Sequence, residues 1–298
     1  MNLGITRDMS LIHTLMRYPA TVDMLLKASK AWDEPIHSRV RAYAIIRRLY
    51  KKGYIGRQEL PVIGYGRSPL LYFVQPKAKQ ICPDLATLLE VESKHNVATL
   101  FRATSETSPH HAIATSSLCA ELERSIGERK KRLQLLRALR ATQFKAPVII
   151  KAVDGESKTM LIPDYTYLID DQGKLKLYFI EIQHQCPLTI PLTRKSVTRS
   201  FKHKLTRYKV LSQSYRNHPI IQNFEHTFSR KIEEFSVLIV TTRRTEQHLQ
   251  NLLAANHANR FIKLFYFARL ETLAEKNIFT NRVWRRSDDK VVSLLPDQ

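Results

Sequence analysis

The chain has 298 residues and a hydrophobic content of 43%, which is enough for two domains that each bury a core. Its 48 Lys and Arg residues against 27 Asp and Glu give a formal net charge of +21, which is outside the range of an ordinary soluble enzyme and indicates a polyanionic partner. No segment approaches the roughly 20 apolar residues of a transmembrane helix, and residues 1–18 lack the apolar core of a signal peptide, so we expect a cytoplasmic protein with no membrane partner.

The basic residues are spread over three segments, 39–52, 124–140 and 194–209, where they alternate with Leu, Tyr and Phe. This distribution predicts several folded basic faces and not a basic tail on a neutral domain. An acidic protein or a membrane surface is the alternative partner, but the apolar interleaving favours nucleic acid. The aromatic platform motif of common RNA-binding modules is missing. Double-stranded DNA is therefore the expected partner, and an RNA-binding or adaptor protein is the alternative.

The first 80 residues are predicted to form three helices and a hairpin. Apolar residues recur at helical spacing over 7–17 and over 21–28. A third helix is predicted from Ser38, a suitable N-cap, to Lys52, and Gly53 ends it. The Arg and Lys residues of this helix are expected to stay outside. The residues that we expect it to bury are Val40, Tyr43, Ala44, Ile46, Leu49 and Tyr50.

The hairpin is predicted from a strand that begins at Tyr54, a Pro- and Gly-rich loop over 61–69 and a second strand over 70–74. Three helices before a hairpin is the order of a winged helix, and Arg-Arg-Leu-Tyr-Lys-Lys-Gly-Tyr-Ile resembles the corresponding segment of winged-helix regulators. The resemblance implies a third helix in the DNA major groove, with a winged helix that contacts protein as the alternative. Arg39 and Arg41 are the candidates for base edges, because Arg can address guanine O6 and N7 together. The candidates for phosphate contacts are Arg47, Arg48, Lys51, Lys52, Arg57 and Arg67.

Residues 83–145 are predicted to be mostly helical, with one helix over 85–96 and another over 110–126. The segment Arg129–Arg140 is predicted to continue as a basic amphipathic helix that lines a DNA channel or solvates one face of the core. The sequence Cys-Pro-Asp at 82–84 marks the expected boundary between a first domain, 1–82, and a second, 83–298.

A second hairpin is predicted over residues 164–183. Asp164 opens one strand, the turn 170–174 reverses the chain, and Glu181 lies near the end of the returning strand. Antiparallel neighbours lie under about 5 Å apart, so both carboxylates can reach one divalent ion if their register and face agree. Two oxygen ligands with waters and a phosphate suit Mg²⁺ or Mn²⁺. The alternative is a solvated hairpin whose acids have no such role.

The surroundings of this hairpin favour a buried site. Residues 175–182 are almost wholly apolar before Glu181, as in a central strand where an unpaired charge would be costly. The first strand of the same sheet is predicted over 147–150, and another buried strand over 235–242. A helix over 246–255, a strand over 262–267 and a helix over 270–275 are predicted to follow. A Lys-rich helix near 201–208 places Lys204 and Tyr208 one turn apart on one face. The fold class is therefore α/β or α+β.

This arrangement resembles the PD-(D/E)XK nuclease fold. The resemblance implies that Asp164 and Glu181 hold the metal and that a Lys two residues after the Glu orients the attacking water. Gln183 occupies that position here and offers no positive charge, so Lys204 or Lys202 must supply it, with Tyr208 in support. The resemblance also implies that an early helix can lend a further acid, for which Glu121 and Glu123 are the candidates, but solvent exposure of both residues is the interpretation that we favour.

The pattern Pro-Asp…Glu-Ile-Gln…Lys-Leu-x-x-Tyr behind an N-terminal winged helix is similar to the replication-relaxation family of plasmid and mobile-element proteins, over roughly residues 7–245. The resemblance implies DNA binding in plasmid maintenance or transfer. Two functions are then expected, of which we favour the first. In the first, the nuclease-like domain adds grip, dimerisation or contact with proteins of a DNA-processing complex; in the second, it is an active Mg²⁺-dependent endonuclease.

Overall fold

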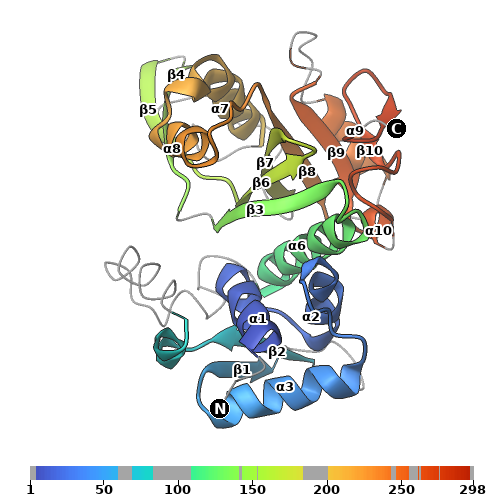
Figure 1. The fold of residues 1–298 in the computed structure, drawn as a ribbon. Helices are drawn as coiled ribbons and strands as arrows, with labels where there is room; N and C mark the ends of the chain where they lie inside the picture. The colour runs from blue at the N-terminus through green and yellow to red at the C-terminus, as the bar shows by residue number, and fades with distance from the viewer. Residues whose placement is uncertain are drawn as a thin grey trace. The chain divides into compact units, whose positions relative to one another are not determined.

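The computed structural model describes residues 5–59, 69–82, 109–140, 143–152, 154–183, 201–242, 246–254, 261, 263–274 and 276–295. The fold is mixed α/β, as predicted, and divides into two compact units, Met1–Lys130 (unit 1) and Lys131–Gln298 (unit 2) (Figure 1). None of the described helices is long and apolar enough to span a membrane.

Unit 1 contains the predicted three helices followed by an antiparallel hairpin. The hairpin pairs Ile55 with Val74 and Glu59 with Leu70. In Figure 1, α3 and α6 lie on opposite sides of this unit, with α1, α2 and the hairpin between them. The elements of unit 1 are α1 (Ile5–Arg17), α2 (Val22–Ala28), η1 (Ser29–Ala31), α3 (Arg39–Lys51), β1 (Ile55–Glu59), β2 (Leu70–Val74), η2 (Pro76–Gln80) and α6 (Pro109–Glu128).

Unit 1 extends beyond the boundary that the sequence suggested near residue 82. The reason is α6, which packs against α2 and η1 and therefore belongs to the same core as the three helices. Leu118 and Leu122 of α6 are buried together with Leu25 of α2. The helix expected over 85–96 lies outside the described residues.

Helix α3 begins and ends as predicted, but it faces the core with different residues. The Ser38 side chain accepts a hydrogen bond from the Arg41 backbone N at 3.3 Å, and Gly53 follows the helix with a φ of +73°. The prediction was right for Ile46 and Leu49 and wrong for Val40, Tyr43, Ala44 and Tyr50, which are exposed. Ala42, which is fully buried, lies in the middle of the side that faces the unit, between Leu49 and Ile46 around the helix. The buried residues of α3 are Ala42, Ile45, Ile46 and Leu49.

Unit 2 is built on a seven-stranded mixed sheet in the order β11-β10-β9-β8-β7-β6-β3. Strands β7, β8 and β9 are parallel, whereas β3, β6 and β7 pair antiparallel. The strands of unit 2 are β3 (Leu133–Arg140), β4 (Ala146–Ala152), β5 (Gly155–Leu161), β6 (Tyr165–Asp171), β7 (Lys174–Gln183), β8 (Phe235–Thr241), β9 (Phe265–Arg269), β10 (Trp284–Arg285) and β11 (Val291–Val292). Its helices are α7 (Phe201–Ser214), η3 (Tyr215–Asn217), α8 (Pro219–Phe228), α9 (Glu246–Ala254) and α10 (Leu270–Leu273).

Two sequence predictions for unit 2 are wrong. Residues 133–140 form β3 and not a basic helix, because pairing with β6 satisfies the backbone and Arg132 donates to Asp171 at 2.7 Å. The strand predicted over 147–150 exists as β4, but it pairs with β5 in a separate two-stranded sheet. That small sheet packs against α7, which buries Val148 and Ile150.

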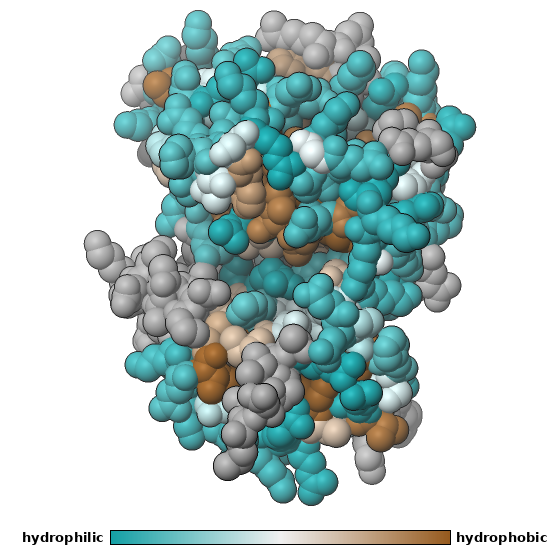
Figure 2. Space-filling view, in the orientation of Figure 1, coloured by the Kyte–Doolittle hydropathy of each residue, from teal (hydrophilic) through white to brown (hydrophobic). Residues whose placement is uncertain are grey.

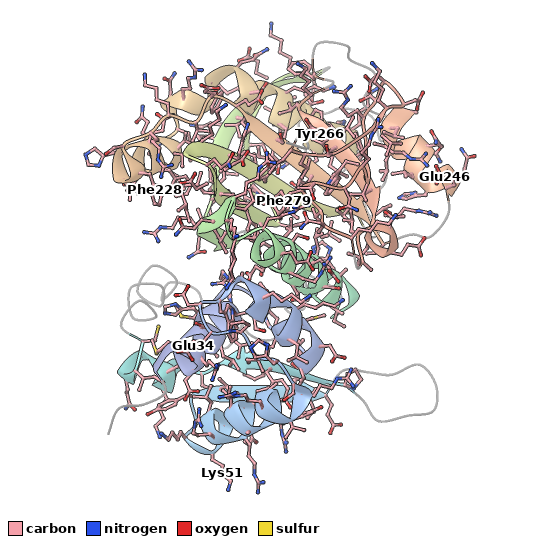
Figure 3. The ribbon with its side chains drawn as sticks, turned by 45° about the vertical axis from the view of Figure 1, so that its right-hand side comes forward. Glu34, Lys51, Phe228, Glu246, Tyr266 and Phe279 are labelled. Atoms are coloured by element: carbon pink, nitrogen blue, oxygen red, sulfur yellow. The ribbon has the colours of Figure 1, made fainter. Side chains whose placement is uncertain are left out.

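Strand β7 lies in the middle of unit 2 and is covered on both faces. On one face Phe179 contacts Tyr208 of α7, with ring centroids 5.6 Å apart. On the other face Tyr178 contacts Phe279, which Figure 3 labels, at 5.7 Å. This double coverage confirms the prediction of a buried central strand and explains its nearly continuous apolar sequence.

Candidate functional site

The β6–β7 hairpin brings Asp164 and Glu181 to the same site, as predicted. Tyr165 pairs with Ile180 across the two strands, and the backbone N of Asp164 donates to the Ile180 carbonyl at 3.1 Å. The Asp164 carboxylate then accepts a hydrogen bond from the Ile182 backbone N at 2.6 Å. This bond holds the Asp164 side chain beside β7, next to the residue that carries the Glu181 carboxylate.

Helix α7 adds Lys204 and Tyr208 to the two carboxylates. The Lys204 ammonium contacts Glu181 Oε2 and lies 3.9 Å from Asp164 Oδ1. One turn later, the Tyr208 hydroxyl donates to Glu181 Oε1 at 2.6 Å. The spacing of four residues on one helix face therefore places both groups over the acidic pair, as the sequence predicted.

Burial controls the protonation of this cluster. Glu181 is 3% exposed, and burial raises its pKa to about 7, with the Asp164 carboxylate adding to the rise and Lys204 opposing it. Burial lowers the pKa of Lys204, but the carboxylates of Asp164 and Glu181 outweigh burial and raise it. Burial and the Glu181 carboxylate hold the pKa of Tyr208 well above its ordinary value. At neutral pH the site therefore holds a charged lysine and a glutamate that is close to its midpoint.

Of the two other candidate residues, Gln183 is buried close to Glu181 in the chain, whereas Lys202 is exposed. Gln183 is buried and follows Glu181 by two residues on β7, so both side chains leave the same face of the sheet. Lys202 is exposed at the start of α7, whereas Lys204 contacts the carboxylates. Of the two lysines that could replace the missing charge at position 183, Lys204 is the one in place.

The carboxylate oxygens of this site are the kind of ligand that a divalent cation prefers. Both carboxylates converge on one cationic group, the Lys204 ammonium, so both are directed to a shared position. Hard oxygen ligands supplemented by water and phosphate oxygens are the usual environment of Mg²⁺. Among the described residues no group of three or more His, Cys, Asp or Glu side chains could hold a metal. Asp164 and Glu181 are the two carboxylates of this site that could hold an ion.

The candidate third carboxylates on α6, Glu121 and Glu123, belong to unit 1 and pair with cations there. Both are buried, so the expectation that they are exposed is wrong. Glu123 accepts two hydrogen bonds from Arg17, at 2.9 and 2.8 Å. Glu121 pairs with Lys27 and with Arg124, the latter at 2.6 Å. These acids hold α6 to α1 and α2, a role that the sequence did not reveal because the partner cations on those helices, Arg17 and Lys27, are 106 and 94 residues away.

Arg207 on α7 is buried one residue before Tyr208 and is a site residue that was not predicted from the sequence. Its guanidinium donates to the Met160 carbonyl of β5 at 3.0 Å. Arg207 therefore links α7, and with it Lys204 and Tyr208, to the small β4–β5 sheet. Its place one turn after the buried His203 is a helical signal that could have identified it.

The outer face of α3 carries most of the predicted DNA-contacting residues. Arg39, Arg41, Arg47, Arg48, Lys51, Lys52 and Arg57 are all exposed. Figure 3 shows Lys51 extending away from the body of unit 1. Over the region that α3 occupies in Figure 1, Figure 2 shows hydrophilic side chains interspersed with apolar ones. Arg67 lies outside the described residues.

Three of these arginines have contacts within unit 1. Arg39 pairs with Asp23 at 2.8 Å, and Arg48 pairs with the buried carboxylate of Asp8 at 2.5 Å. The Arg57 guanidinium lies over the Tyr50 ring, 4.9 Å from its centroid. These contacts connect α3 to α1, α2 and β1 and fix the direction of its basic face.

The neighbours Arg47 and Arg48 should therefore differ in how much each contributes to the stability of unit 1. Replacing Arg48 by Ala leaves the buried Asp8 carboxylate without its guanidinium, and we expect unit 1 to lose about 1–3 kcal/mol of unfolding free energy. Replacing the exposed Arg47 by Ala should leave that free energy within about 0.5 kcal/mol of wild type. Urea unfolding of both variants measures this difference. Equal losses would show that the Asp8–Arg48 pair contributes little to the fold.

The raised pKa of Glu181 predicts a stability that depends on pH. Below the ordinary pKa of 4.5 the group is protonated in both states, whereas between pH 4.5 and about 7 only the unfolded chain loses its proton. As the pH rises from 4.5 to about 7, the unfolding free energy of wild type should therefore fall by about 3 kcal/mol relative to that of Glu181→Gln, and the difference should stay constant above pH 7.

Urea unfolding of both proteins from pH 4.5 to 8 tests this prediction. Trp284, which is buried in unit 2, gives the signal once Trp32 has been replaced by Phe. Parallel curves for the two proteins would contradict the prediction.

Comparisons of the chain with protein-family models, with curated proteins and with solved structures found no significant match.

Proposed function

We propose that the protein binds double-stranded DNA through unit 1, which acts as a winged helix with α3 in the major groove. The observation that carries the proposal is the two-sided character of α3. Ala42, Ile45, Ile46 and Leu49 bury one side, and the opposite side presents a row of exposed Arg and Lys residues. A helix anchored in this way can insert its basic side into a groove about 12 Å wide while its packed side stays in the unit.

Some arginines of α3 form ion pairs within unit 1 and others do not, so we expect them to contact DNA differently. Arg39 and Arg48 share their charge with Asp23 and Asp8, which leaves them less free to reorganise around a base. Arg41 and Arg47 make no hydrogen bond or ion pair with any described residue through their side chains, so their guanidinium groups can turn toward DNA. Arg41 lies in the first turn of α3, where a recognition helix contacts base edges. It is thus the residue that we expect to address a guanine.

A pair of variants tests this docking. Arg41→Ala should relax sequence preference at one or two base pairs, at a cost of about 1–3 kcal/mol in binding free energy. Lys52→Ala should weaken all duplexes alike and reduce the slope of log affinity against log salt by about one. Binding-site selection and salt titration with the full chain measure both effects. Identical behaviour of the two variants would contradict the docking, and the absence of salt-dependent duplex binding would contradict the proposed function.

A second candidate function is metal-dependent cleavage of the bound DNA by unit 2, as a PD-(D/E)XK nuclease-like domain of the replication-relaxation type. The observation that favours it is the convergence of Asp164, Glu181 and Lys204. When bound, Mg²⁺ supplies a Lewis acid for the scissile phosphate and a more acidic water. Lys204 places a positive charge beside the carboxylates, which compensates for the neutral Gln183, and Tyr208 holds Glu181 in position.

Metal dependence decides whether this second function operates. We expect Mg²⁺ or Mn²⁺ to support cleavage of the preferred duplex and Ca²⁺ to support binding without cleavage. The substrate is the duplex recovered from site selection, because a domain that cuts slowly needs its own site to reveal activity. Intact DNA after prolonged incubation with Mn²⁺ would leave DNA binding as the function and assign unit 2 a role in grip or partner contact.

A further inference from the structure

The exposed side of α3 carries apolar side chains that the packing of unit 1 does not use. Val40 is 80% exposed and Tyr43 is 52% exposed, and Ala44 is exposed as well. Residues three and four apart adjoin on a helix, so these three side chains form one apolar strip. At 100° per residue Val40 lies almost opposite the buried set centred on Ile45 and Leu49. The strip therefore occupies the middle of the exposed side, with Arg47 one turn farther along it.

Val40 is a poor choice for this position on the grounds of folding alone. A β-branched side chain loses rotamer freedom in a helix, so Val has a lower helix propensity than Ala. Its exposed methyl groups gain no burial in unit 1 that would offset this loss. An apolar side chain at the centre of a basic face suits a ligand that presents an apolar group among negative charges.

We infer that Val40 is a specificity-determining residue that packs against the C5 methyl group of a thymine next to a guanine addressed by Arg41. The inference rests on the proposed DNA binding by unit 1. The thymine methyl is the apolar group that the base edges present in the major groove. Val40 is the second residue of α3 and Arg41 the third, so both lie in the turn that contacts base edges. The surrounding Arg and Lys residues fit the phosphates on either side and not an apolar protein surface.

The test removes the methyl group from the DNA and its partner from the protein. A preferred duplex is selected with the full chain, and each thymine is then replaced in turn by deoxyuridine, which differs from thymine only by the missing methyl. Wild type should lose about three- to tenfold in affinity at one position. Val40→Ala should bind the thymine and the deoxyuridine forms of that position equally well, and its thermal unfolding should be unchanged or shifted upward.

Val291→Ala is the matched control, because Val291 is also exposed but lies on β11 of unit 2. This variant should discriminate thymine from deoxyuridine as wild type does. Unchanged wild-type affinity at every deoxyuridine position, or discrimination retained by Val40→Ala, would overturn the inference and leave DNA binding intact. Absence of any duplex binding would overturn the proposed function together with the inference.

Discussion

Replacing Asp164 by Asn or Glu181 by Gln should reduce metal-dependent DNA cleavage by about a thousandfold or more, if unit 2 is a nuclease. Each change removes one of the two carboxylates that converge on Lys204 and keeps the size of the side chain. Duplex affinity measured in Ca²⁺ should stay within about twofold of wild type, because the proposed recognition surface lies on α3. Cleavage in Mg²⁺ and binding in Ca²⁺, measured on the same selected duplex, test both expectations.

The control for this prediction is Glu156→Gln, which makes the same chemical change at an exposed position of β5. It should cut DNA at the wild-type rate. Lys204→Ala should be as inactive as the carboxylate variants, because Gln183 offers no charge to replace the ammonium. Undiminished cleavage by Glu181→Gln would mean that the reaction takes place elsewhere in the chain.

Replacing Gly127 by Ala should lower the unfolding free energy of unit 1 by about 3 kcal/mol. Gly127 lies in the last turn of α6, where a Cβ atom would be 2.2 Å from the backbone carbonyl carbon and oxygen of Lys30 and 2.5 Å from the Ala31 N. Backbone atoms of η1 cannot rotate away as the end of a side chain can, so α6 and η1 must separate. The loss is measured by urea unfolding followed through Trp32, which is buried in unit 1, after replacement of Trp284 by Phe.

Gly56→Ala is the matched control within the same unit. A Cβ atom at Gly56 would also be close to its neighbours, at 2.4 Å from Phe73 and 2.5 Å from Gln75, but the atoms it meets are the ends of side chains. These side chains can change rotamer, so we expect a loss of less than about 1 kcal/mol. A loss at Gly127 no larger than that at Gly56 would show that the contact of α6 with η1 tolerates an added methyl group.

The local elements of the site could be predicted from the sequence because their signals lie within a few residues. The turn residues 170–174 between two apolar runs predicted the hairpin, and a spacing of four residues placed Lys204 and Tyr208 on one helix face. The end of α3 followed from Gly53, which adopts the left-handed conformation that this residue permits. Convergence of Asp164, Glu181 and Lys204 needed only an antiparallel register and a helix that packs on that face.

The sequence by itself determined the basic charge, the mixed α/β class, the hairpin that carries Asp164 and Glu181, and the spacing that places Lys204 and Tyr208 on one helix face. Tertiary structure alone decided which side of α3 is buried, because both sides of the helix carry apolar residues and its packing against α2 and β1 leaves Val40 outside. It also decided that residues 133–140 form a strand, since a basic amphipathic segment gains its hydrogen bonds from β6 as readily as from a helix. Glu121 and Glu123 acquired their role from cations on α1 and α2, and pairs so distant along the chain leave no local pattern.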